Sequence, residues 1–385
     1  MKNLAILTGS DIRAYGGGEK YVIELVKRLK DFDITVYSFV NKDNVRVNDK
    51  KIKKMLKAKL IYYGALTVPI SKERLPLTLS GLSVLKQFYK YNAIYITDPS
   101  ASTIFMILLY TKFKKLQTKI IFGAHDPGFI RIAPQENKFF KKLLLKFYAP
   151  IYRAILFKVP NIHVLNNDDK KKLEMEGYKG NIYLIPNFLY YNKSKIKICS
   201  NKNRFIVLFG GRLSIYHKGI DLLVAIVNKV LDKNKNIEFR IFGSGVDGQE
   251  LVENLSKKCP KNVEYLGFVS QKDLENEYEN SSLYIMTSRI ETFSLVTLEA
   301  QAYGLPVIAF DIKGPKDIIS DFSGSIIKPF DTDAFANKIL KYYNLWEEGR
   351  LNYNYKKRIK DYIFSKYSEQ IILPKLGSML TKFDN

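Results

Sequence analysis

Short runs of β-branched and aromatic residues alternate with segments of helical periodicity along almost the whole chain, and this alternation limits the folds open to it. Between the runs lie amphipathic stretches such as Glu19–Leu29, whose apolar side chains recur on one face. Strands alternating with helices predict βαβ units and a mainly parallel sheet. In the first half, strands are predicted at Leu4–Thr8, Ile34–Val40, Lys59–Tyr63, Ala93–Thr97, Lys119–Ala124, Asn161–Leu165 and Ile182–Pro186.

The alternation stops once and starts again, which predicts two domains in a chain too long for one hydrophobic core. Residues 190–203 are polar and rich in Lys, and we expect a linker there. We predict an α/β protein with two Rossmann-like, doubly wound domains at 1–188 and 200–352, with a helical segment at 353–385 packed back on the first. Ligands of such sheets bind outside the carboxyl ends of the strands, so we expect a cleft between the domains. Second-half strands are predicted at Arg204–Phe209, Ile237–Phe242, Val263–Leu266, Leu283–Met286 and Pro306–Phe310.

The net charge of +24 is concentrated in the first half of the chain. Residues 1–190 hold 33 Lys and Arg against 15 Asp and Glu, and the remainder holds 29 against 23. Such an excess is typical either of contact with an anionic membrane surface or of a solvated surface. Nucleic acid is disfavoured as a partner because no nucleic-acid-binding motif is visible and Arg is sparse. Phe139–Lys158 alternates basic and apolar residues, which fits a membrane-surface helix or a core-packed helix with a solvated face.

The N-terminus and the cysteines bear on location. The first apolar run meets Gly9 and Asp11 before any small-residue cleavage site, so we expect a strand and not a signal peptide. Cys199 and Cys259 are far apart in sequence and are expected to be free thiols in a reducing cytoplasm. We therefore expect a cytoplasmic protein, with the inner face of the membrane as the surface to which it would attach. His163, within an apolar strand, is expected to be a hydrogen-bonded core residue.

Two motifs that follow predicted strands are suited to bind anions. Gly16-Gly17-Gly18-Glu19 opens the first predicted helix, where glycines let backbone amides approach an anion. Gly211-Arg212 and Lys218-Gly219 place two cations in a strand-to-helix loop, which suits a diphosphate. The alternative for these cations is a solvated Lys and an Arg paired with a nearby acid.

Two pairs of acidic residues suggest different roles. Glu291 and Glu299 follow the predicted strand Leu283–Met286. Residues about seven positions apart lie on the same face of a helix, so both carboxylates would line one pocket. Asp331-Thr332-Asp333 has the DxD form that holds a metal ion in some enzymes. It precedes a helical stretch, where Asp is an ordinary cap, and we expect no metal there.

Taken in this order, with Pro186-Asn187 between the halves, these motifs resemble the GT4 family of retaining glycosyltransferases, which have the GT-B fold. Gly243-Ser244-Gly245 and Gly267-Phe268-Val269 extend the match. The resemblance covers most of the chain and is strongest from Phe205 to Pro329. It implies a hexosyltransferase that moves a hexose from a UDP- or GDP-sugar to a glycan or lipid-linked acceptor, with no metal and no bound cofactor.

The resemblance also assigns roles to residues. Arg212 and Lys218 would bind the donor diphosphate, Glu299 the ribose hydroxyls, and Glu291 the hydroxyls of the transferred sugar. Cations fixed at a leaving diphosphate stabilise the charge that develops there, and the departing phosphate would act as the base. The other implied site residues are His125 beside the donor sugar, Gly17 and Gly18 near the phosphates or the acceptor, Gly211 in the diphosphate loop, and the backbone amides around Phe293, Ser294 and Leu295.

The chain departs from the family pattern at two positions, and other functions stay open. Ser294 stands where the family often has Gly and is expected to narrow the room near the sugar; Phe188 likewise follows Asn187 in place of Gly. A sugar-nucleotide epimerase or a phosphorylase could use the same two-domain plan, although the pyridoxal-phosphate lysine and longer chain of a phosphorylase are not evident. A non-catalytic protein that binds membranes or polyanions is a further alternative, disfavoured by the complete set of motif residues.

Overall fold

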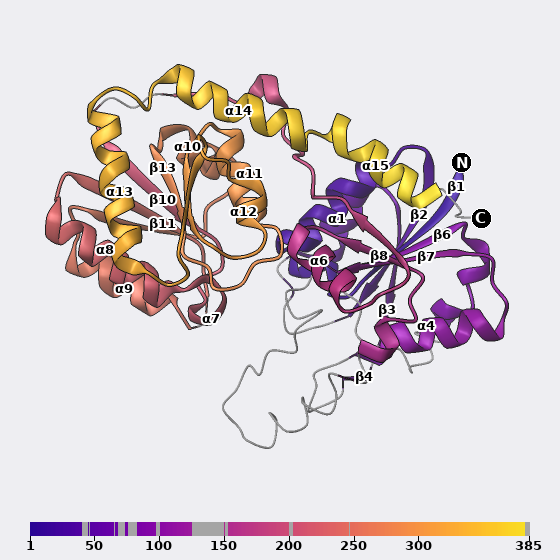
Figure 1. Cartoon of the computed structure of the whole chain (residues 1–385). Helices are drawn as coiled ribbons and strands as arrows, with labels where there is room; N and C mark the ends of the chain where they lie inside the picture. The colour runs from indigo at the N-terminus through magenta and orange to yellow at the C-terminus, as the bar shows by residue number, and fades with distance from the viewer. Residues whose placement is uncertain are drawn as a thin grey trace. The chain divides into compact units, whose positions relative to one another are not determined.

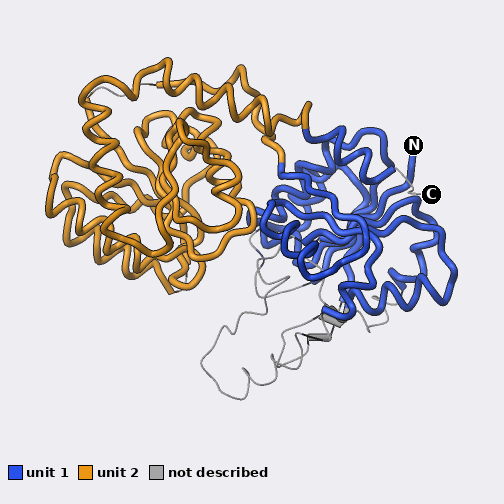
Figure 2. Tube along the Cα trace, in the orientation of Figure 1, with its two compact units in different colours: residues 1–187, 372–385 blue, residues 188–371 orange. Residues whose placement is uncertain are grey.

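The computed structural model contains two compact α/β units. Unit 1 comprises residues 1–187 and 372–385, and unit 2 comprises residues 188–371 (Figures 1 and 2). The structure describes residues 1–40, 45, 47–64, 66–67, 74–75, 83–97, 101–124, 150, 153–199, 203–245 and 247–381.

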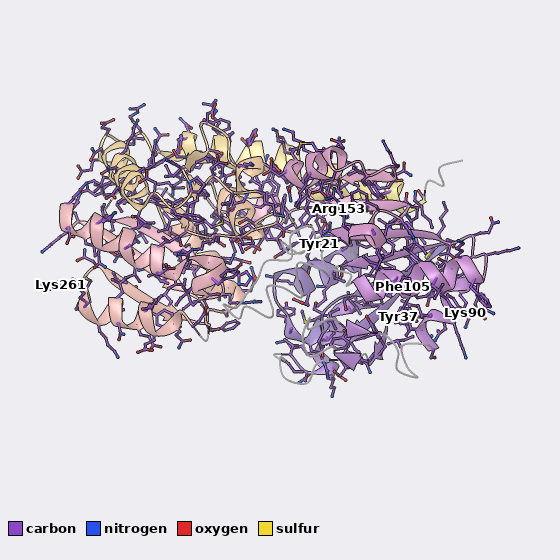
Figure 3. The ribbon with its side chains drawn as sticks, turned by 60° about the horizontal axis from the view of Figure 1, so that its bottom comes forward. Tyr21, Tyr37, Lys90, Phe105, Arg153 and Lys261 are labelled. Atoms are coloured by element: carbon purple, nitrogen blue, oxygen red, sulfur yellow. The ribbon has the colours of Figure 1, made fainter. Side chains whose placement is uncertain are left out.

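Unit 1 is built on a seven-stranded parallel sheet of order β3-β2-β1-β6-β7-β8-β9. Its strands are β1 (Lys2–Thr8), β2 (Phe32–Phe39), β3 (Lys59–Tyr63), β6 (Ala93–Thr97), β7 (Lys119–Ala124), β8 (Asn161–Val164) and β9 (Asn181–Leu184). Its helices are α1 (Gly17–Arg28), α2 (Asp49–Leu56), α4 (Ala101–Phe113) and α6 (Asn167–Met175), and β4 (Leu66–Thr67) pairs antiparallel with β5 (Arg74–Leu75). Buried tyrosine adds to its core, and Tyr37 is one example (Figure 3). The Tyr37 hydroxyl lies 2.7 Å from that of Tyr91.

Unit 2 is built on a six-stranded parallel sheet of order β12-β11-β10-β13-β14-β15, the strand order of a Rossmann fold. Its strands are β10 (Phe205–Gly210), β11 (Ile237–Phe242), β12 (Val263–Gly267), β13 (Leu283–Met286), β14 (Val307–Phe310) and β15 (Gly324–Ile327). Its helices are α7 (Ile215–Lys218), α8 (Ile220–Lys233), α9 (Gln249–Lys258), α10 (Gln271–Asn280), α11 (Leu295–Ala302), α12 (Pro315–Ile318), α13 (Thr332–Glu347) and α14 (Tyr353–Tyr367). The last helix of the chain, α15 (Glu369–Thr381), begins in unit 2 and ends in unit 1.

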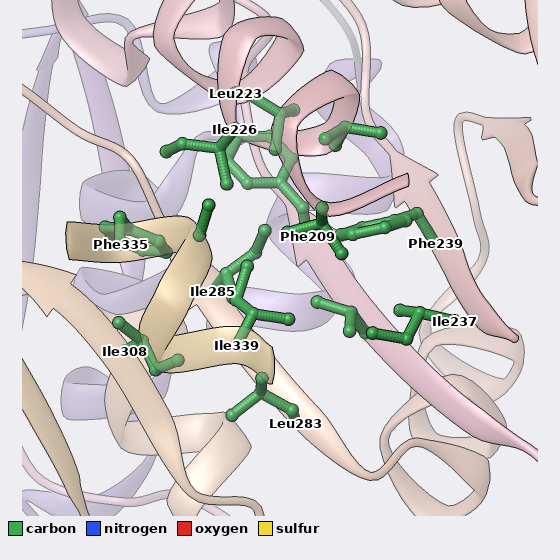
Figure 4. Close-up of a cluster of buried hydrophobic side chains, with 14 of the residues drawn as sticks. Phe209, Leu223, Ile226, Ile237, Phe239, Leu283, Ile285, Ile308, Phe335 and Ile339 are labelled. Carbon is green, nitrogen blue, oxygen red and sulfur yellow. The ribbon is translucent and has the colours of Figure 1, made fainter. Parts of the chain in front are cut away.

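The apolar pattern of the sequence explains why these segments pack as they do. All six residues of β10 are buried, as in a parallel strand covered on both faces. On α8, Ile220, Leu223 and Val227 recur at helical spacing and are completely buried, and α8 contacts both α9 and α13. Figure 4 shows the resulting core, in which Leu223 and Ile226 of α8 and Phe335 and Ile339 of α13 surround the central strands.

The predicted doubly wound architecture is confirmed, and the predicted strands are found with bounds that shift by no more than two residues. Three differences stand out. The strand β15 was not predicted, and the helical segment 353–385 is two helices and not one. Residues 353–371 belong to unit 2, and only residues 372–385 belong to unit 1.

The segment expected to be a linker is instead part of unit 2. Two buried lysines on α14 hold it through its backbone carbonyls: Lys356 Nζ donates to the carbonyl of Cys199, and Lys360 Nζ to that of Ile196, at 2.8 Å each. Lys356 also donates to the carbonyl of Ser281 at 2.8 Å. Burial lowers the pKa of Lys356 to about 8. The polar composition of this segment was misleading because its partners lie about 160 positions away in sequence.

Two further expectations can be compared with the structure. Among the described residues, no helix combines the length and the apolar character needed to cross a membrane. His163 is buried, with Nδ1 2.8 Å from the Tyr95 hydroxyl and Nε2 2.7 Å from the carbonyl of Ile185. Since a carbonyl only accepts, Nε2 carries the proton and Nδ1 accepts from Tyr95. The expectation of a satisfied core histidine is confirmed.

Candidate active site

The strand order of unit 2 places a switch point between β10 and β13. These strands are neighbours, yet the chain leaves β10 toward β11 on one side and leaves β13 toward β14 on the other. Doubly wound sheets bind their ligands at the carboxyl ends of the two strands at such a point. The two loops that start there run from Gly211 to Gly219 and from Thr287 to Ser294, and they contain most of the predicted site residues.

Glycines let the loop after β10 lie against the loop after β11. Gly211 and Gly243 have φ values of +139° and +125°, and a Cβ on Gly243 would come within 1.8 Å of the Gly211 carbonyl oxygen. The amide of Leu213 donates to the carbonyl of Ser244 at 3.0 Å. Only glycine permits both this backbone conformation and this approach, which gives a structural reason for the motif Gly243-Ser244-Gly245.

A second glycine, Gly219, joins the two loops of the switch point. It ends α7 and begins α8 with φ +64°, and a Cβ there would lie 2.3 Å from the carbonyl oxygen of Thr287. The Thr287 hydroxyl donates to the carbonyl of Lys218 at 2.9 Å. The loop after β13 therefore fixes the backbone that carries Lys218.

Lys218 and Glu291 form an ion pair at this switch point. Lys218 Nζ donates to Glu291 Oε1, and the Ser288 hydroxyl donates to the same oxygen at 3.0 Å. Both charged side chains are largely shielded, at 19% and 13% exposure. The structure thus brings together a cation and a carboxylate that are 73 positions apart in sequence, and Lys218 is not the solvated lysine of the alternative interpretation.

Arg212 differs from Lys218 in its surroundings. Its side chain is exposed, and among the described residues it has no hydrogen-bond or ion-pair partner. Arg289, in the loop after β13, does pair with an acid: its guanidinium donates to both carboxylate oxygens of Asp221 at 2.7 and 2.6 Å. Those hydrogen bonds lower the pKa of Asp221. Arg212 is left available to a ligand.

The N-terminus of α11 lies at the end of the loop after β13. Within the part of the chain that the structure describes, the backbone amides of Phe293, Ser294 and Leu295 donate no hydrogen bond. Amides at a helix N-terminus point outward and attract negative charge. These are the amides that the resemblance places near the phosphate and sugar.

Ser294, the first departure from the family pattern, adopts a glycine-like backbone with φ +74°. Its hydroxyl lies 2.8 Å from that of Thr297 and 3.0 Å from the sulfur of Met286, and the residue is only 5% exposed. The side chain is turned into the core of unit 2, contrary to the expectation that it narrows the room near a sugar. Phe188, the second departure, is completely buried.

Glu299 lies on α11 and is 6% exposed. The Tyr190 hydroxyl donates to its Oε1 at 2.7 Å, and the Tyr278 hydroxyl donates to its Oε2 at 3.4 Å. Tyr191 stacks on Tyr190, and Tyr303 stacks on Tyr278, with ring centroids 5.0 and 5.2 Å apart. Burial and the charge of Glu299 raise the pKa of Tyr191 and of Tyr278. Glu299 therefore lies within a cluster of four tyrosines, two of which donate hydrogen bonds to its side chain.

The reasoning that joined Glu291 and Glu299 through one helical face is wrong. Glu291 precedes α11, because the left-handed backbone of Ser294 starts the helix three residues later. The two carboxylates are nevertheless near a common residue: burial raises the pKa of Tyr284 on β13, and both Glu299 and Glu291 add to that effect. The Tyr284 hydroxyl donates to the carbonyl of Gly210, at the end of β10, at 2.9 Å.

In unit 1, the predicted glycine motif lies after β1 and opens α1. Gly16 is the N-cap, and Gly17 and Gly18 are the exposed first residues of the helix. Glu19 accepts a hydrogen bond from the Ser10 hydroxyl, which lies just beyond the end of β1. β1 pairs with β2 and β6, so this motif is also at a switch point. His125 lies outside the described residues.

The acidic motif Asp331-Thr332-Asp333 has structural partners. The Asp331 side chain caps α13 by accepting from the amide of Ala334 at 2.9 Å, which confirms the capping role. Asp333 pairs with Lys229 at 2.6 Å. Over the described ranges, no group of three or more His, Cys, Asp or Glu side chains is arranged to hold a metal ion.

Several contributors to the site were not predicted. Thr287 and Ser288 directly follow a predicted strand, and that position is a signal that could have found them. Tyr190 is 109 positions from Glu299, and no sequence pattern connects the two.

Comparisons with known proteins agree with this architecture. A family described as "Glycosyltransferase Family 4" matches residues 15–190, and one described as "Glycosyl transferases group 1" matches residues 192–360. The chain is 28% identical over 335 residues to an uncharacterized 41.2 kDa protein in the cps region of Klebsiella pneumoniae, covering 83% of this chain and 88% of that protein. It is 29% identical over 226 residues to a poly(ribitol-phosphate) alpha-N-acetylglucosaminyltransferase of Staphylococcus aureus, covering 57% of this chain and only 42% of that enzyme.

Solved structures share the fold at low sequence identity. HepE of Anabaena, in complex with UDP, superposes with a TM-score of 0.76 at 15% identity and full coverage of both chains. Sucrose-phosphate synthase of Thermosynechococcus elongatus superposes with a TM-score of 0.74 at 18% identity, covering 98% of each chain. Two Rossmann-like units of this kind define the GT-B class. The chain belongs to the GT4 family of glycosyltransferases.

Proposed function

We propose that this protein is a retaining hexosyltransferase that uses a UDP- or GDP-sugar as donor and a glycan or lipid-linked molecule as acceptor. The observation that carries the proposal is the Lys218–Glu291 pair at the switch point of unit 2. It sets a cation for a diphosphate beside a carboxylate that can accept hydrogen bonds from sugar hydroxyls.

Charge explains how these residues would act on a donor. Cleavage of the bond between the anomeric carbon and the phosphate oxygen leaves the electron pair, and negative charge, on the diphosphate. Lys218, the exposed Arg212 and the outward amides at the start of α11 would stabilise that charge in the transition state. The acceptor hydroxyl would attack from the face that the diphosphate leaves, and its proton would pass to the departing phosphate oxygen. Retention of configuration follows from this geometry.

The proposal includes neither a metal ion nor a bound cofactor. Arg212 and Lys218 would supply the positive charge that a divalent cation provides in metal-dependent transferases, and the nucleotide sugar enters as a co-substrate. Asp331 and Asp333, the candidate metal-binding motif, have a capping role and an ion-pair partner instead.

The alternatives are less well supported. Named relatives such as the Staphylococcus aureus enzyme are glycosyltransferases, which favours transfer over an epimerase or phosphorylase. The shielded ion pair and the hydrogen-bonded Glu299 favour a working donor site over a non-catalytic protein. His125, Gly17 and Gly18 remain the proposed contributions of unit 1.

The test begins with nucleotide binding. UDP, GDP and their sugars are screened by thermal shift, and release of the nucleotide from the stabilising donor is then measured with a chelator present. Stabilisation by none of them, or loss of turnover on addition of the chelator, contradicts the corresponding part of the proposal.

Lys218→Ala isolates the role of the cation. Loss of a charge-assisted contact worth roughly 1.5–3 kcal/mol is expected to lower turnover by at least tenfold. Lys229→Ala is the matched control, since Lys229 also pairs with a carboxylate, that of Asp333, but comes from the middle of α8. Equal turnover in the two variants contradicts the role assigned to Lys218.

We further propose that the protein works at the anionic inner face of the membrane, where a lipid-linked acceptor would be found. The support is the charge of residues 1–190, which carry 18 of the 24 net positive charges. Phe139–Lys158, the segment from which this idea arose, falls largely outside the described residues.

A further inference from the structure

Tyr190 and Glu299 form a hydrogen bond that the proposed chemistry does not require. The Tyr190 hydroxyl lies 2.7 Å from Glu299 Oε1, the short distance of a bond from a hydroxyl to a carboxylate. Tyr190 follows directly on the buried residues Phe188 and Leu189, and the amide of Leu189 donates to the carbonyl of Tyr367 on α14 at 2.7 Å. The tyrosine therefore approaches the carboxylate from a segment that is anchored directly before it in the chain.

The aromatic neighbours of Tyr190 restrict it further. Its ring stacks on that of Tyr191, with the ring planes 22° apart. Tyr191 contacts the edge of Tyr303 and accepts a hydrogen bond from Gln271 on α10 at 2.8 Å. A ring held on one face by stacking keeps its hydroxyl in place at little further cost in entropy.

The hydrogen-bonding capacity of the carboxylate decides what this arrangement can do. An ionised carboxylate accepts about four hydrogen bonds, and two of them come from Tyr190 and Tyr278. Among the described residues no other donor to the Glu299 side chain is found, and the remaining two positions match the two adjacent hydroxyls of a ribose. We propose that Tyr190 is a positioning residue: it orients Glu299 so that the free lone pairs receive the ribose diol, and so makes the site selective for ribonucleotide donors. This inference rests on the proposed function, because it assigns Glu299 to a nucleotide.

The test couples a protein substitution to a ligand substitution. Dissociation constants of UDP and GDP are measured beside those of their 2′-deoxy and 3′-deoxy forms, for the native chain and for Tyr190→Phe. Phenylalanine keeps the ring and its stacking and removes only the hydroxyl. Tyr191→Phe is the matched control, since it removes a hydroxyl from the same aromatic cluster that bonds to Gln271 and not to Glu299.

In the native chain, the deoxynucleotide that lacks the ribose hydroxyl facing Glu299 is expected to bind about tenfold more weakly than the ribonucleotide. In Tyr190→Phe that penalty is expected to fall to about twofold, because a misoriented carboxylate gains less from the ribose. A merely structural role would weaken ribo- and deoxynucleotides equally and leave the penalty unchanged, as Tyr191→Phe is expected to do.

Two other results have clear meanings. An unchanged penalty, or tighter binding of the ribonucleotide to Tyr190→Phe, overturns the inference; tighter binding would mean that the tyrosine occupies the ribose position. If neither diphosphate binds the native chain, the donor site itself is wrong, and the inference falls with it.

Discussion

Single residues with positive φ determine how the candidate site is built. Gly219 permits the turn from α7 into α8 against the carbonyl of Thr287, and Ser294 begins α11 in a conformation that glycine adopts most easily. The first position cannot carry a side chain, whereas the second carries one that points inward. The two therefore predict different responses to substitution.

Gly219→Ala is expected to destabilise the protein by more than the roughly 1 kcal/mol that a left-handed backbone costs alanine. The added Cβ would also collide with the Thr287 carbonyl, 2.3 Å away. Gly349→Ala is the control, because Gly349 has φ +69° and no heavy atom near its Cβ position. Thermal unfolding of both variants measures the difference. An equal drop in unfolding temperature for the two variants would mean that the backbone near Thr287 shifts to accommodate the new Cβ without cost.

At Ser294, alanine is expected to be more harmful than glycine. Both substitutions remove the hydroxyl that contacts Thr297 and Met286, at a cost of about 1 kcal/mol. Only glycine also relieves the left-handed strain, which offsets that loss. Urea unfolding should place Ser294→Gly near the native free energy of unfolding and Ser294→Ala about 1 kcal/mol below it. The reverse order would show that the backbone is not strained.

Helix α14 is the element that secures the start of unit 2, and it does so with buried cations. Lys356 is surrounded by the carbonyls of Cys199 and Ser281, and desolvation lowers its pKa to about 8 from the ordinary 10.5. Between these values the unfolded chain keeps the proton that the folded chain has lost. The unfolded state then binds more protons, so this group makes the free energy of unfolding rise with pH.

Raising the pH from 7 to 10 is therefore expected to stabilise the native chain relative to Lys356→Met, by up to about 3 kcal/mol. The comparison of pH slopes is informative even though methionine leaves two carbonyls without their donor. Lys357→Met, at the exposed neighbouring position, should keep the native slope. Denaturant unfolding at several pH values gives all three slopes, and parallel slopes for the native chain and Lys356→Met contradict a buried amine with a low pKa.

The elements differ in how well the sequence predicts them, for physical reasons. Strands such as β10 and β13 are continuous apolar runs, because both of their faces are covered, and they were predicted to within a residue. β15 was missed because Gly324 and Ser325 weaken the apolar signal of an edge strand only four residues long. The order of the strands follows from the βαβ connections, which leave few arrangements for a parallel sheet.

The candidate site was predictable where local motifs form it. Gly211 and Lys218 belong to one loop, and their place at the end of a strand follows from the sequence. The contacts of Glu291 and Glu299 could not be predicted, since they depend on packing between segments 73 and 109 positions apart. The inward turn of Ser294 also depends on its buried neighbours, Met286 and Thr297.

At the scale of the whole molecule, charge is the most unusual property. The net charge of +24 is unevenly distributed, with the larger share in residues 1–190. Attraction between lysines and anionic lipids contributes about 1 kcal/mol per residue near the surface and falls off within roughly 10 Å at 0.1 M salt. A membrane partner therefore predicts a strong dependence on salt and lipid charge.

The protein is expected to float with vesicles that contain anionic lipid and to stay behind with neutral ones. Raising the salt to about 0.5 M should release it, since the Debye screening length then falls to roughly 4 Å. Flotation in a density gradient measures both effects. Equal recovery with neutral and anionic vesicles, or no recovery with either, contradicts an electrostatic attachment.

The pairing of Lys218 with Glu291 has a consequence for which anions the site would bind weakly. Lys218 and Glu291 already neutralise each other. A small inorganic anion that bound Lys218 would therefore leave the Glu291 carboxylate without a partner for its charge. Under the proposed function a nucleotide sugar would avoid that loss, because its phosphate would replace the carboxylate as the partner of Lys218 while its hydroxyls would donate hydrogen bonds to Glu291. The cell's abundant free phosphate would thus be a poor competitor for the site. The site would reject inorganic phosphate before it distinguished one sugar from another.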